Sequence, residues 1–158
     1  MSRTGSLRGL AGWPVLTIGG GAVVGYLSNS GVSPWYAALD KPSWTPPPSV
    51  FGPVWTTLYA LMGTAAWMVW TRTGQRLDTP AIVLFLVQLA LNFAWSFLFF
   101  SLQAPGLALV EILMLWVSIV LTMLMFSRQS TAAAALLVPY LLWVTYATAL
   151  NAAIVRAN

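Results

Sequence analysis

Tryptophan, tyrosine and amide side chains are the groups in this sequence that could bind or transform a ligand. The chain contains nine tryptophans, no histidine and no cysteine. Histidine and cysteine supply most zinc and haem ligands, and histidine most acid–base catalysis, so the sequence predicts no metal site and no hydrolytic centre. Indole and phenol rings instead favour stacking on flat apolar ligands, because they offer a large contact area at little conformational cost.

Several of these rings recur at helical spacing. Trp55 and Tyr59 are four residues apart, as are Trp143 and Ala147, and Tyr140 flanks the second pair. Residues four apart share one face of an α-helix. We therefore predict that these five residues line a common ligand pocket.

Amide side chains mark a third face. Gln88 and Asn92 are four residues apart, and Trp95 and Ser96 continue their face one turn later. An amide within an apolar run needs a hydrogen-bonding partner, so this face should point toward another helix or a cavity. Hydrogen bonds between helices and direct ligand contact both remain open for Asn92, while Trp95 is predicted to line the pocket. Glu111 is the only acid within an apolar run, and with no second acid or base beside it no proton relay is predicted.

Composition identifies the elements that must carry these faces. Of the 158 residues, 59% are hydrophobic and only 6% are charged, whereas about 25% are charged in a typical soluble domain. Continuous apolar runs of about 20 residues predict transmembrane helices. We expect a single-domain, multi-pass, all-α membrane protein whose five-helix bundle comprises residues 10–28, 51–71, 80–101, 105–126 and 131–155.

Prolines mark the boundaries of several of these runs. Pro53, Pro80 and Pro105 stand at or near predicted first turns, where a missing N–H costs nothing. Pro139 lies inside the fifth run and should kink it, which would open space beside Trp143.

The long connection between the first two runs is the exception to otherwise short loops. Its segment KPSWTPPPSVFGPVW, residues 41–55, contains five prolines. Proline fixes the backbone angle φ, so we predict a stiff lid over one end of the bundle. Trp35 and Trp44 should line the underside of this lid, with Lys41 as a cation near the pocket mouth.

The seven basic residues lie at the ends of the apolar runs and form no patch, which argues against nucleic acid as a partner. With five spans, one side carries Arg3, Arg8, Arg72, Arg76 and Arg128, and the other carries Lys41 and Arg156. In a bacterial plasma membrane, this bias would place the N-terminus in the cytoplasm. Gly21 and Gly25 form a GxxxG pattern that fits either a dimer face or packing within one bundle.

Three segments resemble the TspO/MBR family, also called the tryptophan-rich sensory protein, translocator protein or peripheral benzodiazepine receptor family. They are WYAALDKPSWTPPPSVFGPVW at residues 35–55, QLALNFAWSFLFF at residues 88–100 and VPYLLWVTYATALN at residues 138–151. The resemblance implies a five-helix bundle, commonly a homodimer in the lipid bilayer, with a pocket beneath the first long loop. A bacterial cell membrane is the expected location.

The resemblance also implies ligands. Family members bind porphyrins, notably protoporphyrin IX, and hydrophobic small molecules such as isoquinoline carboxamides and benzodiazepines. Without histidine or cysteine, we expect metal-free protoporphyrin to be preferred, or haem to be held by stacking, with no covalent cofactor. The expected role is that of a tetrapyrrole sensor, scavenger or transporter.

Some bacterial members are described as degrading porphyrin in light and oxygen, with tryptophans that match Trp55 and Trp143, and this enzymatic activity stays open as an alternative. Animal members bind cholesterol through a motif near the end of the last helix. Here Ala152 stands where that motif has tyrosine, between Leu150 and Arg156. This departure argues against sterol binding at that position.

Overall fold

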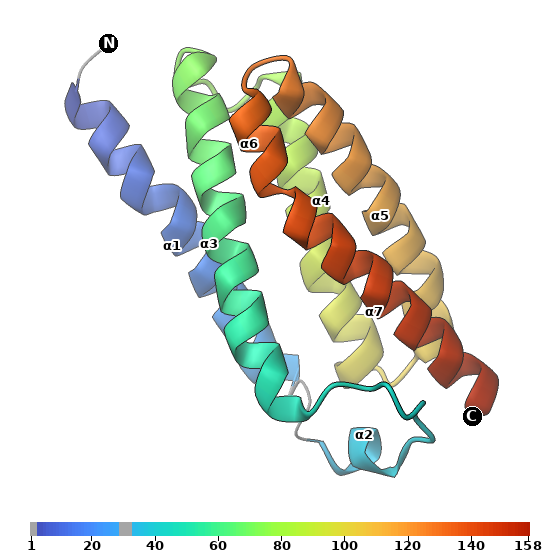
Figure 1. Cartoon of the computed structure of the whole chain (residues 1–158). Helices are drawn as coiled ribbons and strands as arrows, with labels where there is room; N and C mark the ends of the chain where they lie inside the picture. The colour runs from blue at the N-terminus through green and yellow to red at the C-terminus, as the bar shows by residue number, and fades with distance from the viewer. Residues whose placement is uncertain (1–2, 29–32) are drawn as a thin grey trace.

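The protein is built from helices packed side by side, as a computed structural model shows (Figure 1). The structure describes residues 3–28 and 33–158, and the side chains from residue 8 onward within those ranges. Arg3, which the sequence places at the end of an apolar run, is therefore among the residues whose side chains are not described. No strand occurs in the described ranges, which contain α1 (Arg3–Ser28), α2 (Pro34–Ala38), α3 (Pro48–Arg72), α4 (Pro80–Ser96), the π-helix η1 (Phe97–Ser101), α5 (Pro105–Ser127), α6 (Thr131–Leu136) and α7 (Val138–Ala157).

Four segments of the described chain are long and apolar enough to cross a membrane: Arg8–Ser28, Pro80–Ser101, Pro105–Ser127 and Thr131–Ala157. Helix α3 has 25 residues but is not among them. Its three tryptophans and four threonines lower its hydropathy, since indole N–H and hydroxyl groups count as polar. The all-helical membrane architecture is confirmed, whereas the count of five spans is not.

The long helices form a closed arrangement around an apolar core. Helix α1 packs on α3 and α4, α4 on α5, and α5 on α7, while α3 contacts both α6 and α7. Figure 1 shows α2 and the loop that follows it lying across one end of this bundle. The largest fully buried side chains include Tyr140, Phe85, Phe126 and Met62. One end of the bundle is therefore covered by α2, and a site between α2 and the bundle interior is enclosed by several helices.

Helix boundaries agree with the proline pattern at most positions. Pro80 and Pro105 begin α4 and α5, and the predicted kink before Trp143 is a break at Leu137 that separates α6 from α7. Two predictions were wrong in detail. Helix α3 begins at Pro48, so Pro53 lies inside it, and the third run ends in the π-helix η1 rather than continuing as α-helix.

Gly21, the first glycine of the GxxxG pattern, packs within the bundle, whereas nothing lies within 4 Å of a Cβ position at Gly25. A Cβ atom on Gly21 would collide with the ring of Tyr59 on α3. Further along the same contact, Thr17 Oγ1 donates a 2.7 Å hydrogen bond to the Tyr59 carbonyl, and a Cβ on Gly63 would lie 2.6 Å from Pro14 Cα. Small residues thus let the α1 and α3 backbones approach closely, as interhelical packing in lipid requires.

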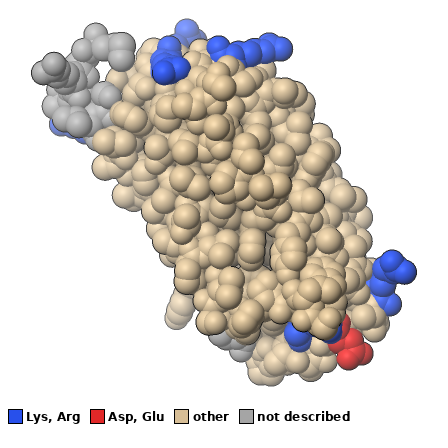
Figure 2. Space-filling model, viewed as in Figure 1, with Lys and Arg blue, Asp and Glu red and all other residues tan. Residues whose placement is uncertain are grey.

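Exposed charged side chains lie at the two ends of the molecule, and Figure 2 shows an uncharged surface between them. At the end away from α2, Arg72 donates a 2.6 Å hydrogen bond to the Gln129 carbonyl, and Arg76 pairs with Asp78 at 2.7 Å. The hydrogen bond from Arg76 lowers the pKa of the Asp78 carboxyl. This distribution matches a bundle whose apolar flank faces lipid.

Replacing Gly63 with alanine should destabilise the protein, because the new methyl group would meet the α1 backbone, which cannot rotate away. We expect a loss of about 1–3 kcal/mol, measured as a lower apparent Tm in detergent. Gly19→Ala is the matched control, since nothing lies within 4 Å of its Cβ position. Equal melting temperatures for Gly63→Ala and the unaltered protein would contradict the close α1–α3 contact.

Candidate functional site

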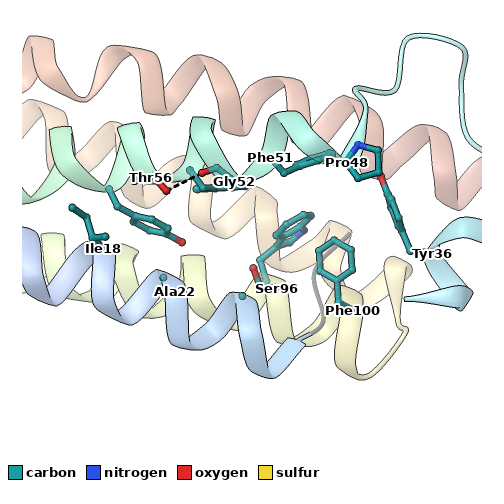
Figure 3. Close-up of a pocket in the computed structure, with 14 residues that line it drawn as sticks. Ile18, Ala22, Tyr36, Pro48, Phe51, Gly52, Thr56, Ser96 and Phe100 are labelled. Atoms are coloured by element: carbon teal, nitrogen blue, oxygen red, sulfur yellow. Dashed lines mark hydrogen bonds between the residues drawn. The ribbon is translucent and has the colours of Figure 1, made fainter. Parts of the chain in front are cut away.

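A cavity of about 380 Å³ lies beneath α2, between α1, α3 and the end of α4. Figure 3 shows Ile18 and Ala22 of α1 across from Thr56 of α3, with Tyr36 and Pro48 at the lid end. The residues that line it are Ile18, Gly21, Ala22, Gly25, Tyr36, Pro48, Phe51, Gly52, Trp55, Thr56, Tyr59, Trp95, Ser96 and Phe100.

The walls of this cavity differ in character. Helix α1 contributes mainly small residues, Gly21, Ala22 and Gly25, so the space exists because these positions carry little or no side chain. Helix α3 and the α4–η1 segment contribute the rings of Trp55 and Trp95 among others. A flat apolar molecule would therefore meet ring surfaces on one side and a shallow backbone surface on the other.

A second hollow of about 30 Å³ lies between α3, η1 and α7. Trp143 and Ala147 line it, and Trp55 and Trp95 line both hollows. The rings of Trp55 and Trp143 are 6.5 Å apart and nearly perpendicular. The structure thus brings together the two predicted residue pairs on α3 and α7, but the larger space lies on the α1 side of Trp55.

Behind the cavity, buried polar side chains form a hydrogen-bonded column across three helices. The Tyr59 hydroxyl donates to Asn92 Oδ1 at 2.6 Å, Asn92 Nδ2 donates to the Tyr140 hydroxyl at 3.0 Å, and Tyr140 donates to Gln88 Oε1 at 2.8 Å. The predicted inward orientation of the amide face is confirmed. Asn92 and Tyr140 are both buried behind the lining, whereas Tyr59 presents its ring to the cavity.

Trp95 is held in place by an amide on α7. Its indole Nε1 donates to Asn151 Oδ1 at 3.1 Å, and Asn151 Nδ2 donates to the Pro105 carbonyl at 2.9 Å. The ring also stacks on Phe99, with centroids 5.3 Å apart. Sequence reasoning missed Phe99 and Phe100, although the run FLFF directly after Trp95 and Ser96 was the available signal.

The lid tryptophans brace the lid and leave the cavity to other residues. Trp35 packs edge-on against Phe99 with centroids 5.7 Å apart, and Trp44 packs edge-on against Tyr146 of α7 with centroids 5.5 Å apart. The Tyr146 hydroxyl also donates to the Trp44 carbonyl. Neither tryptophan lines either of the two hollows described, so ligand contact by Trp35 or Trp44 stays a prediction.

Lys41 closes the C-terminal end of α2. Its ammonium donates to the carbonyls of Tyr36 and Leu39 at 2.6 and 2.9 Å, and it lies 4.9 Å from the centre of the Tyr36 ring. Burial, together with the nearby Tyr146, raises the pKa of the Tyr36 phenol, which stays neutral at physiological pH. Lys41 therefore fixes the lid fold, and its contact with a ligand remains a prediction.

Asp40 ties the lid to the far end of α7. Its N–H donates to Asn158 Oδ1 at 3.1 Å, and Asn158 Nδ2 donates to the Asp40 carbonyl at 3.0 Å. Together with the Tyr146 contact, this pair fastens the lid at two points of one helix. The cavity roof is thus held from α7.

Comparison with known proteins connects this arrangement to one family. The family model described as TspO/MBR matches residues 13–156. A tryptophan-rich protein TspO from Chlorobaculum tepidum is 49% identical over 125 residues, covering 78% of this chain and 79% of the relative. The translocator protein of Homo sapiens is 43% identical over 126 residues (78% and 75%), and a tryptophan-rich sensory protein of Cereibacter sphaeroides is 40% identical over 124 residues (78% and 77%).

Tyr146→Phe should loosen the lid, because it removes the hydroxyl that binds the Trp44 carbonyl while keeping the ring contact. We expect faster amide hydrogen exchange at Ser43, Trp44 and Thr45, measured by mass spectrometry, since the prolines around them have no amide hydrogen. Tyr26→Phe is the control, since the Tyr26 side chain is 84% exposed on α1. Unchanged exchange in the lid of Tyr146→Phe would show that the two-point attachment does not hold it.

Proposed function

The chain belongs to the TspO/MBR family of integral membrane proteins, and from that membership we propose that it binds a porphyrin in the cavity between α1, α3 and α4. The observation that carries this proposal is the cavity of about 380 Å³, walled by indole and phenol rings beneath a braced lid. Its size falls within the range of about 300–1,000 Å³ that is typical of small-molecule pockets.

The lining favours a flat aromatic ligand over a polar one. Trp55 and Trp95 offer ring faces, and the Thr56 hydroxyl is already bonded to the Gly52 carbonyl at 2.9 Å. Few polar groups therefore compete for ligand contacts. A metal-free protoporphyrin satisfies this lining, and haem would be held by stacking without an axial histidine or cysteine. Other hydrophobic small molecules of similar thickness would share the site.

The carboxylate edge of such a porphyrin would lie toward the lid. Lys41 and Arg156 are the two cations at that end of the bundle, and no cation lines the cavity among the described residues. Because the Lys41 ammonium already has carbonyl partners, it would contribute a favourable field without a dedicated ion pair. This placement leaves the apolar macrocycle inside and its charged groups near water.

The proposal extends to membrane topology and biological role. Helix α3, at about 1.5 Å per residue, is long enough to span the bilayer and would form a fifth span beside the four apolar ones. In a bacterial cell membrane, the basic end away from α2 would face the cytoplasm. The protein would act there as a tetrapyrrole sensor, scavenger or transporter. It would form a homodimer, as the family resemblance implies.

A second candidate function is porphyrin oxidation in light. The perpendicular contact of Trp55 with Trp143 favours it, because adjacent indole rings could exchange an electron with an excited porphyrin bound beside them. Illumination in air with protoporphyrin IX, followed by absorbance, tests this role. Slower bleaching in Trp143→Phe than in the unaltered protein supports it, whereas equal rates support binding alone.

Protoporphyrin IX titrated into detergent-purified protein should quench tryptophan fluorescence in a saturable way. Trp55→Ala should raise Kd about ten- to a hundredfold, since a buried aromatic side chain contributes about 1.5–3 kcal/mol. Trp116→Phe is the matched control, because Trp116 lies outside both hollows and is 36% exposed. Quenching that never saturates, or that is unchanged in Trp55→Ala, would indicate partitioning into micelles instead.

A further inference from the structure

The cavity beneath α2 is open on one side. Its lining residues on α2, α4 and η1 are buried or half-buried, whereas four of those on α1 and α3 are exposed: Ala22, Pro48, Gly52 and Thr56. The three on α3 are four residues apart, so they share one face of that helix. Figure 3 shows Ala22 on one side of the space, and Gly52 and Thr56 on the other. The cavity therefore opens between α1 and α3.

Close contacts between α1 and α3 limit this opening on the side away from α2. Thr17 Oγ1 donates to the Tyr59 carbonyl at 2.7 Å, and the Tyr59 ring packs on Gly21. Beside the cavity, nothing lies within 4 Å of the Cβ positions of Gly25 and Gly52. The two helices are thus in close contact up to Gly21, and small residues leave an opening beyond it.

The opening lies at the depth of lipid acyl chains. Gly52 and Thr56 are about 6 and 12 Å along the axis from Pro48, where α3 begins, and Ala22 is about 9 Å from the end of α1 at Ser28. With 25 residues, α3 is about 37 Å long, which exceeds the hydrocarbon core by about 4 Å at each end. With α3 across the bilayer, as proposed above, the opening therefore faces hydrocarbon.

A route from water through the lid is obstructed. Tyr36 of α2 covers that end of the cavity and is 5% exposed. The lid is fastened to α7 by the hydrogen bonds between Asp40 and Asn158, and by the Tyr146 hydroxyl. Entry at the lid would break these contacts, whereas entry between α1 and α3 would displace only an acyl chain.

We propose that the ligand enters and leaves the cavity sideways, from the lipid, through the opening between α1 and α3. Ala22, Gly52 and Thr56 form its rim. The inference rests on the porphyrin binding proposed above and restricts the ligand to molecules that dissolve in the bilayer, because a solute confined to water would not reach the rim. Small side chains on both helices let a flat macrocycle pass edge-on.

Gly52→Cys gives a reversible way to block the opening. The chain has no cysteine, so a benzyl thiol attached there through a disulfide is the only modification. In lipid nanodiscs, this group should slow both binding and release of protoporphyrin IX about tenfold or more, because both cross the same barrier. Reduction of the disulfide should restore both rates, which stopped-flow tryptophan quenching measures. Unchanged binding, or faster release, overturns the proposal.

Gly106→Cys with the same label is the matched control. Gly106 is exposed near the start of α5, at the lid end of the bundle (Figure 1). Nothing lies within 4 Å of its Cβ position, and it lines neither hollow. Its label should leave both rates unchanged. Equal slowing at Gly106 would contradict entry beside Gly52, because it would show an effect of the label that does not depend on the opening.

A spin label on Thr56→Cys tests the opening without porphyrin. In bilayers it should collide with oxygen, which dissolves in lipid, as often as a label on Leu113→Cys, a position 53% exposed on α5. A label on Ser43→Cys, in the exposed part of the lid, gives the value for a water-soluble nickel chelate. Collision of the Thr56→Cys label with the chelate, or with neither reagent, overturns the proposal. An absence of saturable protoporphyrin quenching would instead refute the proposed function, and the collision rates would still locate the opening.

Discussion

The interior of a membrane bundle offers no water to its polar groups, and this constraint organises the protein around the hydrogen bonds of Tyr59, Asn92, Tyr140 and Gln88. These bonds join α3, α4 and α7 through residues that are 33 to 52 positions apart in the sequence. Each helix presents the polar group that another requires, and this fixes their relative rotation about their own axes. Once the rotation is fixed, the faces that carry Trp55, Trp95 and Trp143 must point toward one another.

The cavity follows from that rotation and from the small residues of α1. Because Tyr59 is held by Asn92, its ring cannot withdraw from α1, and only glycine at position 21 leaves room for it. The same small residues continue along α1 to Gly25 and leave space that larger side chains would fill. Close packing at Gly21 and open space near the lid are thus two results of the small residues of α1.

The sequence predicted the helix faces better than it predicted the lid. Gln88 and Asn92 could be assigned to the interior because residues four apart share one helix face, and amides on that face need hydrogen-bond partners that lipid cannot supply. Trp44 could not be placed in the same way, because its partner is a ring on α7 that no local spacing indicates. Tertiary contacts of this kind depend on where the lid comes to rest.

The same distinction explains why the larger hollow lies on the α1 side of Trp55. Helical spacing correctly joined Trp55 to Tyr59 and Trp143 to Ala147, but it carries no information about the volume between them. In the structure, Trp55 stacks on Tyr59 at 5.4 Å and contacts Trp143 edge-on, so its ring fills the space between α3 and α7. A flat ligand that spans both hollows must displace this ring. Tyr59 is anchored by Asn92, so Trp55 is the partner that would have to move.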